Sequence, residues 1–348
     1  MVSSCRATPT DRCTRGTLSG WGLPALAVAL MAWAYAGVWT AGPVYEDHNP
    51  AVAQEDAILE PSNPLVDDWV WFRRPVTNLS YRLTNNLGGG ARAAHVASLL
   101  LHVAVVAAVA VFAGLVGSSP WVAGAVMLLH PLASESVVYL SARSELLATL
   151  AVLLCLIALT SGHLLVGIGC AGLAFLCNPA PAAALIGLLP LCVWRGWIPI
   201  GLRQEVLALV GLLVVCVVFG FGRAGHTAEL TAPAPWLVYV GHQVAGTVAL
   251  AGRVVVPWPL LIDHGFAWTS WGLVLARVSL LALALGAAVA LRQRCPWALL
   301  LVGWWVLGFG ARLWVPSWNY LTEHHAYLPL VGVALVAGEL VSEAACAA

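Results

Sequence analysis

Two adjacent carboxylates, Glu46 and Asp47, are the residues whose position most directly suggests chemistry. They follow a membrane-length apolar run and precede His48, so we expect them at the membrane surface. A carboxylate at the boundary between water and lipid can act as a general base. Composition alone leaves a second interpretation open, in which the pair only solvates the end of a helix.

The segment 41–92, which contains this pair, is the only long run too polar to lie in a bilayer. It carries seven of the sixteen acidic residues of the chain. Near its end Trp69, Trp71 and Phe72 precede Arg74, and aromatic residues in such a place are typical of membrane interfaces. A carboxylate beside arginines at this boundary suits a base that faces a lipid-borne phosphate.

A second polar stretch runs from His130 to Glu145, between two apolar runs. Glu145 opens the second run, where the helix dipole favours an acid in the first turn. In a helical conformation Glu135 and Tyr139 would share one face. Charged groups at a membrane are costly and therefore indicate function. The alternative is a simple surface pair between Arg143 and Glu145.

These groups must be positioned by membrane helices, because the composition excludes a water-soluble globule. The 348 residues are 61% hydrophobic and 9% charged, with a mean hydropathy of +0.87, whereas soluble domains are about 25% charged. The net charge of zero excludes a basic surface for nucleic acid. All sixteen cationic residues are Arg, which is typical of a GC-rich bacterial genome.

No metal ion is predicted. The nine cysteines are scattered singly, without zinc-site spacing, and are interpreted as small buried hydrophobes. The short acidic run at Glu46 offers little geometry for a divalent cation. His324 and His325, which follow Glu323, could bind a metal or phosphate, or could close over a pocket or cap the last helix, and both interpretations stay open.

The expected fold is an all-α polytopic membrane bundle of about 10–11 transmembrane helices, because a span needs about 20 apolar residues. Candidate spans lie at 21–40, 93–116, 119–133, 145–160, 163–177, 180–195, 204–222, 236–256, 271–291, 297–315 and 325–342.

The positive-inside rule favours ten crossings. With eleven, Arg292 and Arg294 would lie outside if the Arg-rich N-terminus is inside. The weakest span is 236–256, which contains His242 and Arg253, and we expect it to be interfacial or re-entrant. All the polar clusters then lie on the outer face.

We therefore predict an integral, multi-pass protein of a bacterial inner membrane, with a cytoplasmic tail at 1–20 and one membrane domain at 21–348. The first outer loop is long and spans 41–92. A second outer region, 223–270, includes the possible re-entrant segment.

The stretch from His130 to Leu147 resembles a signature of the transmembrane and tetratricopeptide-repeat O-mannosyltransferases and their bacterial relatives, which are GT-C membrane glycosyltransferases. The matching residues are His130, Pro131, Glu135, Tyr139, Arg143, Glu145 in place of Asp, Leu146 and Leu147. Further pieces follow in the family's order: Tyr45-Glu46-Asp47-His48, Arg74-Pro75-Val76, Leu79-Ser80, Leu87-Gly88-Gly89, His95, Leu101-His102, Pro257-Trp258-Pro259-Leu260 with Asp263, and Glu323 with Tyr327-Leu328-Pro329. The ordered set covers about residues 21 to 342.

Besides Glu145, the chain departs from the family pattern at four further places: Glu46 replaces Asp, Ala133 replaces His, Asn178-Pro179 replaces Lys-Glu, and His324 replaces Arg. The repeat modules are absent, so a separate repeat-containing partner chain is a further expectation. No protein cofactor is expected.

The resemblance implies a GT-C-like bundle that moves a sugar, such as mannose, from a polyprenyl-phosphate donor to a hydroxyl of a protein or glycan on the outer face, with inversion. Asp47 or Glu46 would be the base, and Arg143, Arg74 and Arg223 would bind the donor phosphate. The residues implied to orient the site are His48, His130, Glu135, Tyr139, Asp263, Glu323 and His324.

Two other functions are weighed against this one. The departures from the pattern suggest a family member that has lost catalysis and acts as a membrane scaffold. A lipid or solute transporter would carry broken helices in corresponding halves, and the sequence shows no such symmetry.

Overall fold

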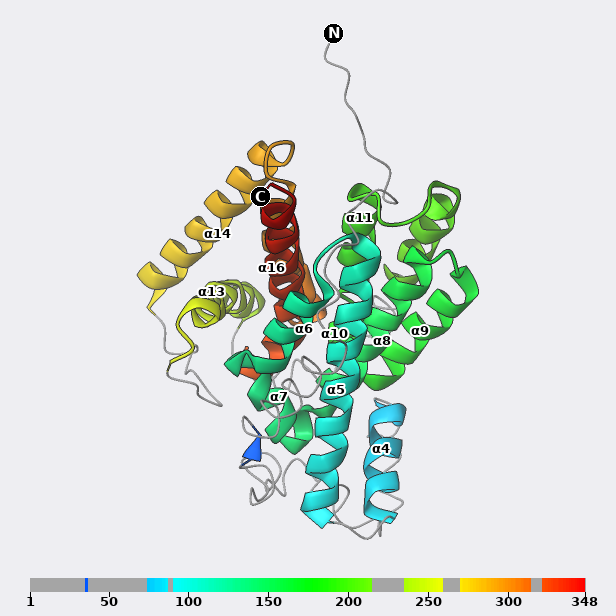
Figure 1. Ribbon diagram of the computed structural model, residues 1–348. Helices are drawn as coiled ribbons and strands as arrows, with labels where there is room; N and C mark the ends of the chain where they lie inside the picture. The colour runs from blue at the N-terminus through cyan, green and yellow to red at the C-terminus, as the bar shows by residue number, and fades with distance from the viewer. Residues whose placement is uncertain are drawn as a thin grey trace.

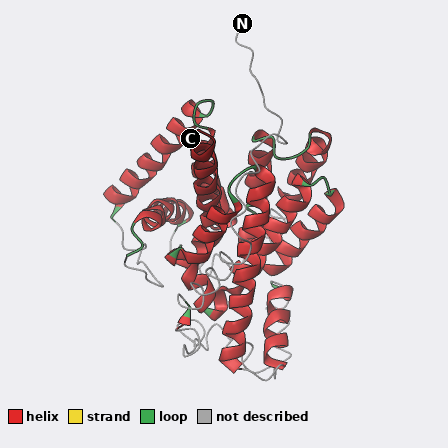
Figure 2. Cartoon of the chain, in the orientation of Figure 1, coloured by secondary structure: helices red, strands yellow, loops and turns green. Residues whose placement is uncertain are grey.

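The computed structural model describes residues 35–36, 74–86, 90–214, 235–258, 270–313 and 321–347. These ranges fold into helices joined by short loops, with no strand among them (Figure 2). The all-α class predicted from the sequence is therefore confirmed for this part of the chain.

Most of the described helices are rich in Ala, Val, Leu and Gly, whereas the helices Pro75–Asn86 and Ser134–Val138 are more polar. In chain order they are α4 (Pro75–Asn86), α5 (Gly90–Val116), α6 (Pro120–Leu129), α7 (Ser134–Val138), α8 (Arg143–Thr160), α9 (Leu164–Cys177), α10 (Pro179–Ala182), α11 (Leu185–Trp194), α13 (Trp236–Val255), α14 (Trp271–Leu291), α15 (Pro296–Gly308) and α16 (Tyr327–Ala347). Short 3-10 turns connect them: η5 (Pro131–Ala133), η6 (Leu140–Ala142), η7 (Ile200–Leu202), η9 (Gly310–Leu313) and η10 (Glu323–Ala326).

Within the described ranges, four helical stretches are long and apolar enough to cross a membrane, so the chain is an integral membrane protein. They are Arg92–Val116, Leu140–Thr160, Trp271–Leu291 and Glu323–Ala347. The bent pair Pro120–Leu129 and Pro131–Val138, with 61° between its halves, would make a fifth as a broken span or a re-entrant loop. Ten or eleven crossings stay a prediction.

Proline and glycine set the breaks between helices. His130 is extended, at φ −70° and ψ 126°, because the residue before Pro131 is disfavoured in the α region. Asn178 is extended for the same reason before Pro179, and its side-chain oxygen accepts a hydrogen bond from the Ala180 backbone N–H at 3.3 Å. These two breaks bring polar side chains to the helix ends.

The core is a set of helices that run side by side: α8 packs on α5 and α9, and α6 lies between α5 and α16 (Figure 1). Close approach of α15 and α16 requires Gly332, where an added Cβ would lie 2.6 Å from the Trp304 ring. Small residues at helix contacts are the usual means of close packing in membranes. Trp304 is fully buried there and donates to the Leu328 carbonyl at 3.2 Å.

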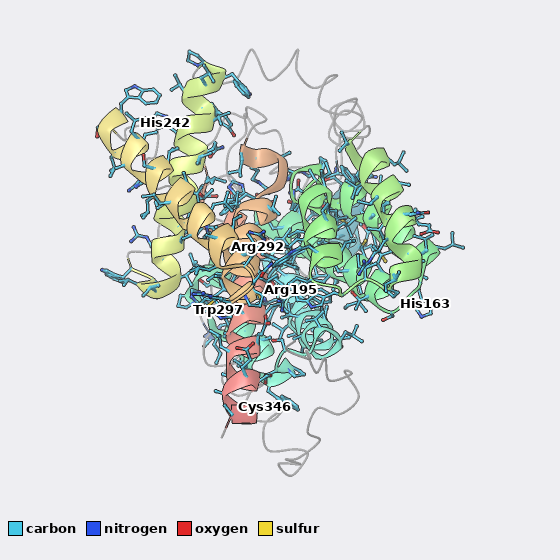
Figure 3. All side chains as sticks on the ribbon, turned by 90° about the horizontal axis from the view of Figure 1, so that it is seen from above. His163, Arg195, His242, Arg292, Trp297 and Cys346 are labelled. Carbon is cyan, nitrogen blue, oxygen red and sulfur yellow. The ribbon has the colours of Figure 1, made fainter. Side chains whose placement is uncertain are left out.

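Helix α13 runs across the other helices. It is seen end-on in Figure 1 and lengthwise in Figure 3, where α14 crosses it on the flank of the molecule. Although α13 is long enough to span, it is not among the four membrane-length stretches, and it contains His242, Gln243 and Arg253. The expectation that residues 236–256 do not cross the membrane directly stays a prediction.

The two ends of the bundle differ in character. Arg195, after α11, forms an ion pair with Glu339 on α16. Glu323 and His325 precede the same helix, about 20 Å away at the α-helical rise. Figure 1 shows the α14–α15 connection, which contains Arg292, beside the C-terminus. This connection therefore lies at the same end of the bundle as Arg195. The loops that contain Arg195 and Arg292 therefore lie at one end of the bundle, and Glu323 and His325 lie at the other.

Candidate functional site

The predicted site residues Glu135 and His324 are in direct contact, although 189 residues separate them. One Glu135 oxygen accepts the His324 backbone N–H at 2.7 Å, and the other lies 2.9 Å from ring atom Nδ1. The Tyr139 ring packs against His324 with centroids 5.5 Å apart. The helical register predicted for Glu135 and Tyr139 thus serves to hold one histidine.

Glu145 forms a second buried cluster at the start of α8. Its Oε1 accepts a hydrogen bond from Asn178 Nδ2 at 2.7 Å and pairs with the Arg312 guanidinium. The neighbouring Ser144 hydroxyl lies 3.1 Å from an Arg74 nitrogen, which donates to it, and 3.2 Å from Asn178 Nδ2. Two arginines from distant parts of the chain therefore contact the neighbouring residues Ser144 and Glu145.

The two clusters form one site, which we call the Arg74–Arg312 site: Arg74, Glu135, Tyr139, Ser144, Glu145, Asn178, Arg312, His324 and His325. His325 joins its halves, because its ring centre lies 4.2 Å from that of His324 and both arginines lie near enough to act electrostatically on it. Arg74 is exposed, whereas the Arg312 side chain is only 11% exposed. In this half of the site the Arg312 guanidinium pairs with Glu145 and the Arg74 guanidinium donates to Ser144, and guanidinium groups suit an anion such as a phosphate.

The His324–His325 pair has a structural role within η10. The Thr322 backbone N–H donates to His325 Nδ1 at 3.1 Å and forms a capping box. The Ser136 hydroxyl donates to the His324 carbonyl at 3.2 Å. Among the residues that the structure describes, no group of three or more His, Cys, Asp or Glu side chains could hold a metal ion. Of the two interpretations left open, the capping role is the one that these contacts show.

Arg143, predicted to bind the donor phosphate, is instead a buried packing residue. It is 0% exposed and lies 4.4 Å from the centre of the Tyr81 ring. Its guanidinium donates to the Ala94 carbonyl at 2.7 Å, the Thr84 hydroxyl at 3.2 Å, and the Ser80 carbonyl and Ser98 hydroxyl at 3.3 Å. Because these groups use four of its five N–H donors and its side chain is fully buried, Arg143 is not placed to contact a ligand.

His130 is likewise held by backbone groups. Its Nδ1 accepts from the Leu132 N–H at 3.2 Å, and its Nε2 lies 3.0 Å from the Val254 carbonyl, to which only a protonated Nε2 can donate. This histidine therefore connects the break after α6 to α13. The predicted orienting role takes the form of a structural tether.

Several predicted site residues lie outside the described ranges: Glu46, Asp47, His48, Arg223 and Asp263. Glu323 lies within them and is 2% exposed. Tyr35, which is described, lies eleven residues before Glu46. Its hydroxyl is 3.4 Å from His102 Nε2, and His102 Nδ1 is 2.6 Å from the Tyr327 hydroxyl. This chain of rings connects the N-terminal region to the helix that follows η10.

Sequence reasoning missed Arg312. Its signal was available, since it is the single charged residue in the apolar run 297–315, and intramembrane charges deserve a functional hypothesis. Asn178 was noted only as a departure from a family pattern, whereas it hydrogen-bonds to both Ser144 and Glu145.

Chemically, the site can bind and polarise an anion such as a phosphate, with Glu135 and His324 fixed beside it. Comparison with known proteins finds no relative of this chain. No family model matches the chain, no curated protein matches it, and no solved structure matches it.

Proposed function

We propose that the protein is a membrane glycosyltransferase that moves a sugar from a polyprenyl-phosphate donor to an acceptor hydroxyl on the extracytoplasmic face. The Arg74–Arg312 site holds the donor phosphate. Asp47 or Glu46 acts as the base, and the reaction inverts the anomeric centre.

The observation that carries the proposal is the meeting of separate sequence pieces at one place. Arg74 contacts Ser144, and Glu135 contacts His324. These residues belong to three of the segments whose order resembles the GT-C family. Their meeting at the end of the bundle remote from Arg195 and Arg292 supports a shared site on the face opposite the basic loops.

In the proposed reaction the acceptor oxygen attacks the anomeric carbon while the bond from that carbon to the phosphate oxygen breaks. The bonding electron pair leaves with the phosphate, and the acceptor proton passes to the carboxylate of Asp47 or Glu46. Arg74 and Arg312 stabilise the charge that grows on the phosphate, and burial strengthens this interaction because little water screens it. The phosphate replaces Ser144 as a partner of the exposed Arg74.

The experiment is a transfer assay in membranes, with polyprenyl-phosphate mannose as the first donor probe. Asp47→Asn and Glu46→Gln, made singly, test the base, and full activity in both would end that assignment. Arg74→Gln should raise the donor KM about tenfold, because it removes one charge-assisted hydrogen bond to the phosphate. Arg292→Gln is the matched control, since Arg292 is exposed at the other end and, among the described residues, its side chain donates to the Val289 carbonyl of its own helix.

Donor binding separates this function from a scaffold that has lost catalysis. A scaffold would bind the donor in an Arg74-dependent way and show no turnover with any acceptor. Turnover that depends on Asp47 or Glu46 supports the transferase. Absence of donor binding to the wild-type chain would reject both.

A further inference from the structure

A second pair of arginines lies on the flank of the molecule, away from the Arg74–Arg312 site. Arg277 is on α14 and Arg253 is near the end of α13, and each is a charged neighbour of the other. In the part of the chain that the structure describes, neither forms an ion pair with a carboxylate. Arg253 donates to the Trp258 carbonyl at 2.8 Å, which leaves further N–H groups available.

The surroundings of Arg277 are apolar and outward-facing. Only 11% of its membrane-length helix is buried inside the molecule. Leu273 and Leu280, one turn before and one turn after Arg277, are 45% and 57% exposed, so the arginine belongs to a stripe that faces lipid. A cation there is costly unless an anion or water accompanies it.

The position along α14 suits the headgroup level. Trp271 begins the helix and is 52% exposed, and Trp258 is 78% exposed, as expected for aromatic residues at a membrane interface. Arg277 lies about 9 Å along the helix from Trp271. Because helical side chains lean toward the N-terminus, its guanidinium points back toward this interface. Arg292 marks the opposite end of the same helix.

We infer that Arg253 and Arg277 bind the phosphate of an anionic membrane lipid on the α13–α14 flank, at the end of α14 remote from Arg292. The guanidinium forks contact the phosphate oxygens, and the acyl chains lie along Leu273 and Leu280. Arg253 belongs to α13 and Arg277 to α14, two helices that cross in Figure 3, and the two arginines are electrostatic neighbours, so one headgroup can contact both. The inference requires no glycosyltransferase activity.

The test uses the full chain purified in detergent. Retention of phosphatidylglycerol is measured by native mass spectrometry, with phosphatidylcholine as the neutral comparison. The wild-type chain should retain phosphatidylglycerol preferentially. Arg277→Gln should weaken retention about tenfold, and the double variant with Arg253→Gln by more, since each removes a charge-assisted contact.

Arg292→Gln is the matched control, because it removes an exposed arginine from the same helix at its other end. Its retention should equal that of the wild-type chain. The inference would be overturned if the double variant retained as much phosphatidylglycerol as the wild-type chain. It would also be overturned if Arg292→Gln lost as much retention as Arg277→Gln. Displacement of the lipid by millimolar inorganic phosphate would also overturn it, because the lipid chains would then contribute nothing. An unchanged melting temperature in each variant shows that the fold is intact.

Discussion

Arg143 and Arg312 are both buried arginines, yet their surroundings differ. Arg143 lies between α4, α5 and α8 and is bound by carbonyls and hydroxyls, with no carboxylate among its hydrogen-bond partners. Arg312 pairs with Glu145 beside the exposed Arg74. Both kinds of surroundings satisfy a guanidinium, but only the second leaves charge at an accessible edge.

The difference shows how the matched motif is used in this structure. The motif arginine, Arg143, fixes the helices that carry the site, and an arginine outside the motif supplies the charge. Ser144 and Glu145, which belong to the Arg74–Arg312 site, follow Arg143 directly in the sequence. The sequence alone does not show which guanidinium lies beside them, since that depends on packing between segments far apart in sequence.

The comparison predicts the largest effect for Arg143→Ala. This change leaves the Ala94 carbonyl and two hydroxyls without their donor and opens a cavity under Tyr81. We expect a loss of at least about 3 kcal/mol in the free energy of unfolding, from cavity and unsatisfied polar groups together. Unfolding in detergent, compared with the exposed Arg292→Ala, measures it. Wild-type stability in Arg143→Ala would show that the buried network contributes little.

A slightly smaller effect is expected at the Arg312–Glu145 pair. Arg312→Met alone should cost about 3 kcal/mol, because it leaves a buried carboxylate without its cation. Adding Glu145→Leu should restore most of the stability while donor binding stays lost. This pattern distinguishes a ligand-binding arginine from a packing arginine. If the double variant keeps full donor binding, Arg312 does not contact the phosphate.

The sequence predicted the helices well, because a membrane helix is defined by a long local run of apolar residues. The runs 93–116, 145–160, 163–177 and 271–291 correspond closely to α5, α8, α9 and α14. The run 119–133 corresponds to α6 and the turn η5, and Pro131 lies where the chain bends by 61° between α6 and the stretch Pro131–Val138.

The site was only partly predictable. Glu135, Tyr139 and His324 do converge, but their partners depend on long-range contacts that no local pattern encodes. Arg312 and Asn178 reach Glu145 through the turn η9 and the break before Pro179. Both contacts depend on how η9 and α10 lie beside the start of α8, which a single sequence does not specify.

The Glu135–His324 contact should show a moderate effect. Glu135→Gln keeps one acceptor oxygen and loses the other, so we expect about 1–2 kcal/mol of lost stability. Under the proposed function, transfer should fall further than donor binding, because His324 is displaced while Arg74 and Arg312 remain. Comparing the change in kcat with the change in the donor KM measures this difference. A change in stability without any change in transfer would limit Glu135 to packing.

The smallest effect is expected at the opposite end of the bundle, where Arg195 pairs with Glu339. The two side chains are 14% and 16% exposed, and Arg195 also lies over the Trp197 ring. Arg195→Gln should cost only about 1 kcal/mol, because the glutamine amide can still donate a hydrogen bond to Glu339. Because this pair lies about 20 Å along α16 from the Arg74–Arg312 site, donor binding and transfer should be unchanged. If Arg195→Gln keeps full stability but loses transfer, the two ends of the bundle are coupled through α16. The Arg195–Glu339 end could then no longer be described as purely structural.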